Sequence, residues 1–168
     1  MVLLLLAALP LVGCESSQSI QANSDAATKA CAPAPCAIVG GFKLTVTSLN
    51  RNVSGGIYLK PEAGDHHVTI QLAFANGSNQ TRSIAQSDFT LRDASARVHG
   101  VAFAPIDGCE MWQPVDQGTG RSVPMKVSPG STSGPKDLCF QASGPPEGPV
   151  VLLWSSAFLP SRIEIPAA

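Results

Sequence analysis

The stretch "HVTIQLAFAN", residues 67–76, alternates apolar and polar side chains, and this alternation decides the fold. Successive side chains of a β-strand point to opposite faces, so a period of two predicts a strand that is buried on one face. The apolar set, which we expect to face a core, is Val68, Ile70, Leu72 and Phe74. The polar set, which we expect to face solvent, is His67, Thr69 and Gln71.

Segments of the same kind recur along the chain and are separated by residues that favour turns. Gly and Pro number 15 and 14 among the 168 residues, and no long window shows a convincing helical period of 3.6. A strand that is apolar on one face needs a second sheet to cover it, so the pattern predicts an all-β fold, an antiparallel β-sandwich. The further expected strands are 42–47, 88–93, 97–103, 121–127, 136–140, 150–154 and 161–166.

The N-terminal end predicts where in the cell the protein is located. Residues 2–13 carry no charge, but this run is shorter than the ~20 residues that span a bilayer and is typical of a secretory signal. Leu11-Val12-Gly13-Cys14 resembles the lipobox of bacterial lipoproteins. The resemblance implies that residues 1–13 are a lipoprotein signal peptide and that Cys14 carries diacylglycerol and an acyl chain such as palmitate. An ordinary secretion signal is the alternative, and the absence of Lys or Arg from this run leaves open a true start upstream of Met1.

The next segment, residues 15–35, is small, polar and Pro-containing, without sustained periodicity. Such a composition is typical of a flexible tether, with a reach of roughly 25 Å. We therefore expect the lipidated cysteine and a disordered tether over residues 14–36, and the folded domain over residues 37–168.

Four cysteines remain once Cys14 is assigned to lipid: Cys31, Cys36, Cys109 and Cys139. An even number in an exported chain predicts two disulfides, for which there are three connectivities. Zinc is the rival, but the close cysteine pairs of zinc sites are missing, so we expect no metal. We favour Cys109–Cys139, which joins a long loop to a strand, together with Cys31–Cys36.

A family resemblance rests on residues 68–93, "VTIQLAFANGSNQTRSIAQSDFTLRD", followed by "SPGSTSG" running into "LCF". These blocks resemble the immunoglobulin-like domain of unknown function of many bacterial lipoproteins, which is related to a mycobacterial secreted immunoprotective antigen. The resemblance implies an immunoglobulin-like sandwich of about 7–9 strands and supplies no catalytic residues. Two positions depart from the pattern: Ala96 stands in a turn where a glycine is expected, and Pro135 lies where a strand should begin.

Catalytic and metal-binding patterns are weak. Ser133 and Lys136 have the Ser-x-x-Lys spacing of penicillin-recognising enzymes, but that chemistry needs a helix and Gly134-Pro135 disfavours one. His66 and His67 are adjacent on an expected strand, so they point to opposite faces and cannot chelate one metal as a pair; His99 is a remote third candidate. We expect solvated histidines, no catalytic residues, no metal and no cofactor.

Residues 104–121 form the longest stretch without strand alternation, and long loops in compact domains are often functional. This loop carries Met111, Trp112 and Gln113, a candidate binding set because aromatic residues and Met are enriched at recognition surfaces. The alternative is that Trp112 plugs one end of the sandwich.

The net charge is −1 and 14% of residues are charged, which argues against nucleic acid as a partner. The sequence therefore predicts a non-enzymatic module of the cell envelope that recognises an envelope or extracellular protein or serves an accessory role. It would be held by lipid on the cell membrane or outer membrane, with the domain facing the exterior or periplasm. A small-ligand or metal carrier and an envelope hydrolase are the alternatives.

Overall fold

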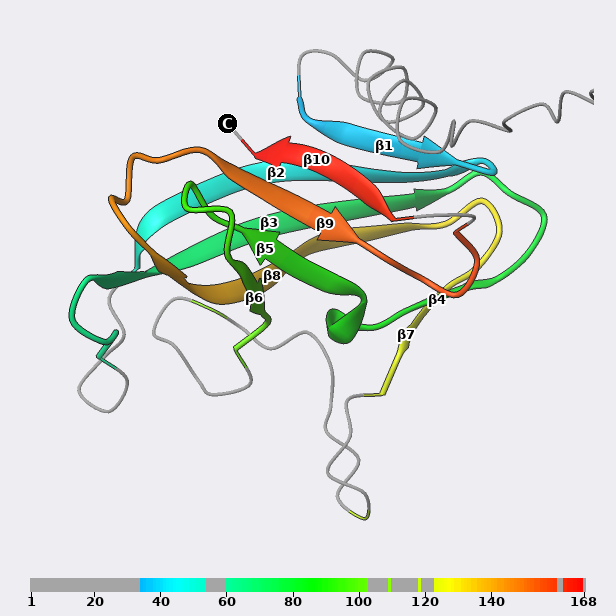
Figure 1. Cartoon of the computed structure of the whole chain (residues 1–168). Coiled ribbons are helices and arrows are strands. Elements are labelled where there is room, and N and C mark those ends of the chain that lie inside the picture. Colours follow the sequence, from blue (N-terminus) through cyan, green and yellow to red (C-terminus); the bar gives the residue numbers. More distant parts are fainter. Residues whose placement is uncertain are drawn as a thin grey trace, which may run out of the picture.

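A computed structural model describes residues 34–53, 60–102, 109, 118, 123–159 and 162–167. Two four-stranded antiparallel sheets form a β-sandwich, with β10, β9 and β5 in front of β2, β3 and β8 (Figure 1). The first sheet has the order β1 (Cys36–Val39), β2 (Phe42–Val53), β3 (Asp65–Asn76), β8 (Thr132–Ser143). The second has the order β10 (Ile163–Ala167), β9 (Val150–Trp154), β5 (Phe89–Arg92), β6 (Val98–Gly100).

A small third sheet pairs β4 (Arg82–Ile84) with β7 (Met125–Val127), and one 3-10 turn spans Gln86–Asp88. The predicted antiparallel β-sandwich is thus confirmed. The strands β1 and β4 were not predicted, and β1 begins one residue before the expected domain boundary at 37. Among the described residues, no helix has the length and apolar character needed to cross a membrane.

The core lies between the two large sheets. Alternation in β3 sends the predicted apolar set inward: Val68, Ile70, Leu72 and Phe74 are buried in one continuous hydrophobic cluster. Aromatic rings fill its centre, where Trp154 of β9 stacks on Phe89 of β5 at 6.2 Å and Phe42 of β2 lies 6.0 Å from Trp154. Offset and tilted aromatic pairs at such distances stabilise a core beyond the area that they bury.

Two prolines lie in strands at the edges of the sheets. Pro135 lies within β8, where the pairing with β3 shifts register between Leu72 and Phe74, and Pro166 lies within β10. Proline has no amide hydrogen to donate, so it is tolerated at an edge or beside a bulge rather than in a central strand. The strand therefore continues through Pro135, which we expected to interrupt its start.

The turn between β5 and β6 explains the unusual residue at position 96. Ala96 adopts a φ of 62°, and its amide donates to the carbonyl of Asp93 at 3.0 Å. The left-handed conformation strains any residue that carries a Cβ, which is why the family pattern led us to expect a glycine here. The turn keeps its shape in spite of the alanine.

The hydrogen bonds of Asn76 explain why an asparagine ends the stretch of residues 67–76. Its side-chain amide donates to the carbonyls of Gln80 and Val127, each at 2.8 Å, and its Oδ1 accepts the amide of Ser78 at 3.0 Å. The side chain is almost fully buried and joins the end of β3 to β7. Because both the nitrogen and the oxygen of its side-chain amide are hydrogen-bonded, this asparagine has a structural role.

Candidate functional site

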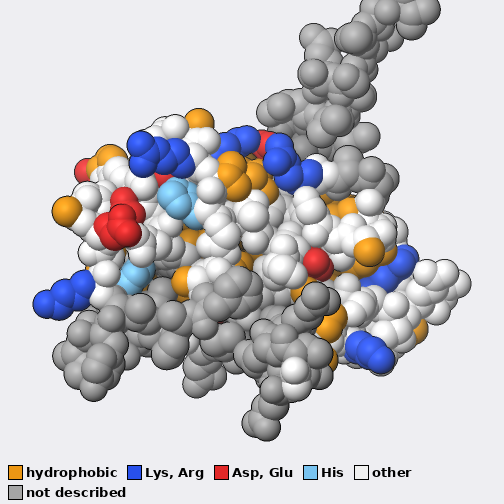
Figure 2. Space-filling view, turned by 60° about the horizontal axis from the view of Figure 1, so that its bottom comes forward, with side chains coloured by type: hydrophobic (Ala, Val, Ile, Leu, Met, Phe, Trp, Pro, Cys, Tyr) orange, Lys and Arg blue, Asp and Glu red, His pale blue; other side chains and the backbone are white. Residues whose placement is uncertain are grey.

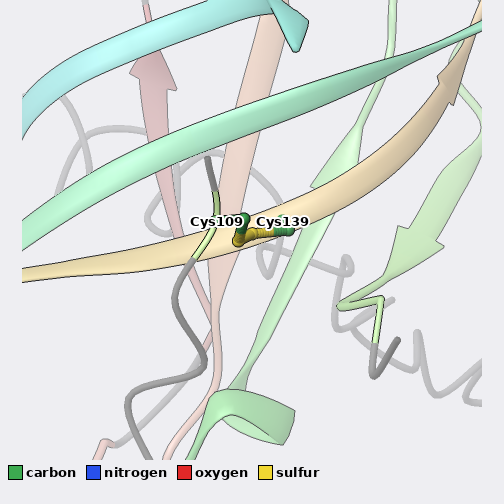
Figure 3. Close-up of a disulfide and its surroundings, with 2 residues drawn as sticks. All are labelled: Cys109 and Cys139. Carbon is green, nitrogen blue, oxygen red and sulfur yellow. A yellow bond between two sulfur atoms is a disulfide. The ribbon is translucent and has the colours of Figure 1, made fainter. Parts of the chain in front are cut away.

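A disulfide joins Cys109 to Cys139 of β8, as favoured from the sequence, with the two Cα atoms 6.3 Å apart (Figure 3). Cys36 is disulfide-bonded as well. The other predicted partner, Cys31, lies outside the described residues, and so do the predicted signal peptide and Cys14.

Cys139 holds the connection after β6 at two points. The amide of Ala102 donates to the main-chain carbonyl of Cys139 at 2.7 Å, and Cys109 bonds to its sulfur. Ala102 and Cys109 are therefore both attached to Cys139 of β8. The candidate binding residues Met111, Trp112 and Gln113 follow Cys109 in the sequence and lie outside the described residues.

The outer face of β3 and β8 is covered where the disulfide attaches. Leu138 and Phe140 face the core, so Cys139 faces outward, opposite Thr69. Cys139 and Thr69 are nevertheless only 3% and 5% exposed, and His67 is 4% exposed. The prediction that His67 and Thr69 face solvent is wrong: they lie on the outer face, but that face is shielded around the disulfide.

His66 is half-buried, and the prediction of solvated histidines fails for its ring nitrogens. His66 lies opposite the buried Ala142, and both of its ring nitrogens are buried without a hydrogen-bond partner in the described structure. On the outer face, Nδ1 of His67 and Oγ1 of Thr69 also lack such a partner. A buried polar atom without a partner destabilises the fold by an amount comparable to a lost hydrogen bond.

A second polar cluster lies where the β5–β6 turn meets β8. The carboxylate of Asp93 accepts hydrogen bonds from the amides of Ser95 and Arg97 in its own turn, at 2.8 and 3.0 Å, and from the amide of Ser143 at 3.3 Å. His99 of β6 lies 2.7 Å from the same carboxylate. Asp93 thus fastens the turn of one sheet to a strand of the other.

The hydrogen bonds around Asp93 control its ionisation. Burial alone would raise the pKa of Asp93, but hydrogen bonds from His99, Arg97, Ser95 and Ser143 together lower the pKa below its usual value. At Asp88, by contrast, burial dominates and raises the pKa of the carboxyl group. The Asp93 cluster therefore stabilises the charged form of the carboxylate.

Asp93→Asn is expected to lower the free energy of unfolding by roughly 2 kcal/mol at neutral pH, because an amide replaces the anion that accepts from three partly buried backbone donors. A lowered carboxyl pKa stabilises the fold above the unfolded value of 3.8, and this contribution is lost as the pH falls through the lowered pKa. The difference between wild type and variant in urea unfolding should therefore shrink below about pH 4. A difference that stays constant down to pH 3 would contradict this role.

The chemistry of these clusters is structural. Ser133 and Lys136 lie on the strand β8 rather than on a helix, so their spacing does not bring them onto one helical face. Among the described residues, no group of three or more His, Cys, Asp or Glu side chains could hold a metal ion. The dyad of His99 and Asp93 orients an imidazole, but the carboxylate is fully engaged with the backbone around it.

The described surface is mixed in character. Figure 2 shows charged side chains of both signs and scattered hydrophobic side chains on the face that it presents. The large apolar side chains with the greatest exposure come from three separate places, Ile38 on β1, Val98 on β6 and Val123 before β7. The most distinctive described feature is therefore the shielded outer face around Cys139, which we did not predict as a site.

A comparison with one solved structure agrees with the fold. The chain is similar to a candidate lipoprotein, ycdA, of Bacillus subtilis, with a TM-score of 0.55 and 8% identity, covering 79% of this chain and 38% of that one. The chain therefore spans well under half of the Bacillus protein. An uncharacterized beta-sandwich protein of Clostridium difficile aligns with a TM-score of 0.43 and 13% identity, over 79% of this chain and 89% of that one.

A search of curated proteins found no match to the chain. The family model described as a domain of unknown function, DUF4352, matches residues 36–124, which is more than half of the sequence. Its range begins at the first residue of β1 and ends just before β7. The chain belongs to the DUF4352 family.

Proposed function

We propose that this protein is a lipid-anchored, non-catalytic module of the cell envelope that recognises a protein partner through Met111, Trp112 and Gln113. The observation that carries the recognition role is the attachment of Cys109 to β8, because it fixes the chain two residues before Met111 to a rigid sheet. A binding segment fixed to a rigid scaffold loses less conformational entropy on association than a free one.

The anchor is supported by Leu11-Val12-Gly13-Cys14 and by the description of the Bacillus subtilis neighbour as a candidate lipoprotein. The proposed location is the cell membrane or outer membrane, with the sandwich facing the exterior or periplasm. The proposed kinship with the mycobacterial secreted antigen rests on the pattern of residues 68–93. The absence of catalysis is part of the proposal and is supported by the structural use of Asp93 and His99.

Cys14→Ser is expected to move the protein from the membrane fraction to the soluble fraction, or to leave it as uncut precursor, because no acyl chain is then attached. The measurement is detergent partitioning followed by mass determination of the N-terminal peptide. Val98→Ser, which changes an exposed side chain of β6, is the matched control and should stay with the membrane. Normal partitioning of Cys14→Ser would show that the anchor is not this cysteine.

Trp112→Ala is expected to weaken partner binding at least tenfold, since truncating an aromatic anchor typically costs 2 kcal/mol or more. The measurement is in-cell crosslinking of the whole chain, with quantitative mass spectrometry of the partners retained by wild type and by each variant. Val123→Ala, at a separate exposed position, is the control and should retain them. Equal retention by wild type and Trp112→Ala would overturn the recognition role, and recovery of a bound small molecule alone would favour a carrier.

A further inference from the structure

Asn76 and Gly77 form the only Asn-Gly pair in the sequence. In such a pair the main-chain nitrogen of the glycine can attack the side-chain amide carbon of the asparagine, because glycine has no side chain to obstruct the approach. The nitrogen bonds to Cγ, the bond from Cγ to Nδ2 breaks, and ammonia leaves with the proton from the glycine nitrogen. Water then opens the cyclic imide to give an aspartyl or isoaspartyl residue.

The native fold holds the attacking nitrogen in place. The amide of Gly77 donates to the carbonyl of Gly41 at 2.8 Å, and the carbonyl of Asn76, in the same peptide unit, accepts from the amide of Gly130 at 2.7 Å. Asn76 is also the last residue of β3, and an extended backbone turns the following nitrogen away from the side chain. Closing the imide ring requires rotation of this peptide unit, which would break both hydrogen bonds.

The leaving group and the carbonyl oxygen of the side chain are held as well. Nδ2 donates to the carbonyls of Gln80 and Val127 at 2.8 Å each. Oδ1 accepts from the amide of Ser78 at 3.0 Å and from its hydroxyl at 2.6 Å. Asn76 is only 1% exposed, so water has little access to the side-chain carbon. The native state therefore opposes both the cyclisation and the hydrolysis that follows it.

The product of the reaction does not fit this site. Deamidation replaces Nδ2 with a carboxylate oxygen, which cannot donate and would face the carbonyl oxygens of Gln80 and Val127. A buried anion beside two acceptors destabilises the fold. An isoaspartyl residue also adds a carbon to the main chain, which displaces Gly77 from its hydrogen bond with Gly41. Either product weakens the junction between β3 and β7.

We propose that Asn76 is a deamidation site that the native fold protects and that unfolding exposes. A molecule that unfolds converts Asn76 to an aspartyl or isoaspartyl residue and does not regain the native junction between β3 and β7. The change is one-way because the ammonia is lost to solvent. Unfolding thus leaves a permanent chemical mark on the chain. This inference does not depend on the proposed anchor or recognition role.

Asn79 supplies an internal contrast. It is exposed and lies in the connection between β3 and β4, so the fold protects it less than Asn76. It is followed by Gln80, whose side chain hinders attack by the main-chain nitrogen. Unfolding should therefore accelerate deamidation of Asn76 strongly and deamidation of Asn79 much less.

The test is incubation of the whole chain at pH 8 and 37 °C, with and without a denaturing concentration of guanidinium chloride. Peptide mapping by mass spectrometry, against synthetic aspartyl and isoaspartyl standards, gives the rate of deamidation at each asparagine. Asn76 should react at least about tenfold more slowly in the folded chain, because only molecules with an open junction react. Equal rates at Asn76 in the folded and unfolded chains, or equal acceleration of Asn76 and Asn79, would overturn the proposal.

A second measurement tests whether the product fits the native fold. Asn76→Asp produces the aspartyl form directly, and Asn79→Asp is the matched control at an exposed position. At pH 8, Asn76→Asp should unfold at a lower denaturant concentration than wild type, or fail to fold, whereas Asn79→Asp should unfold at the wild-type concentration. A wild-type unfolding midpoint for Asn76→Asp would show that the modified chain can return, which contradicts the proposal.

Discussion

Leu72→Asp is expected to abolish folding of the domain. Leu72 is fully buried, lies opposite Val46 on β2 and Lys136 on β8, and belongs to the continuous core cluster. An ionised carboxylate placed there loses its hydration, and an ion pair with Lys136 would offset only part of that loss, so the change costs several kcal/mol in addition to the lost packing. Domains have a free energy of unfolding of only about 5–15 kcal/mol, so the variant should show no cooperative unfolding transition by circular dichroism.

The matched control is Lys43→Asp, on the neighbouring strand. Lys43 is exposed, lies opposite Ala75 in the β2–β3 ladder, and alternates with the buried residues Phe42 and Leu44. Its change should shift the free energy of unfolding by about 0.5 kcal/mol or less, the usual range for surface substitutions. Equal damage from Leu72→Asp and Lys43→Asp would show that the register of the first sheet is incorrect.

Cys139→Ser is expected to lower the melting temperature by on the order of 10 °C, the second largest effect. The bond to Cys109 closes a loop with a sequence separation of 30 residues, and the chain-entropy model assigns such a loop roughly 3–4 kcal/mol. The substitution also removes one of the two attachments of the connection after β6. The measurement is thermal unfolding under non-reducing conditions, together with limited proteolysis, which should cut first within residues 104–121.

The comparison variant for this prediction is Cys36→Ser. Cys36 is disulfide-bonded, and its expected partner Cys31 would close a loop of only about six residues, worth roughly 2 kcal/mol before strain is considered. The fall in melting temperature should therefore be smaller than for Cys139→Ser. A larger fall for Cys36→Ser, or a peptide linking Cys139 to Cys31 or Cys36 in a non-reducing digest, would contradict the pairing.

The sandwich could be predicted because alternation is a local signal. In β3, one face carries Val68, Ile70, Leu72 and Phe74, and twelve residues give six full periods of two. The strands β1 and β4 contain four and three residues, too few to distinguish a strand from a turn. Pro135 was misleading for a related reason: whether a proline interrupts a strand depends on its place at an edge, which is a property of the assembled sheet.

The low exposure of Thr69 and Cys139 was missed because Cys109, which bonds to Cys139, lies far along the chain. Thr69 and His67 have the polarity of solvated positions, and nothing in residues 67–76 indicates that Cys109 attaches nearby. A signal was nevertheless present. The expected bond between Cys109 and Cys139 joined a long loop to a strand, and this bond implied that a face of that strand is covered. What could not be foreseen was the register that places Thr69 directly opposite Cys139.

The two edge prolines have a consequence for how molecules of this protein tolerate crowding. An exposed strand edge is a template on which another chain can add a strand, and such addition leads to fibres and aggregates. Here Pro135 and a register shift interrupt one edge, Pro166 interrupts another, and β1 and β6 are only four and three residues long. Molecules packed side by side at high density, as the proposed anchor would hold them on a membrane, should therefore stay separate instead of polymerising through their sheets.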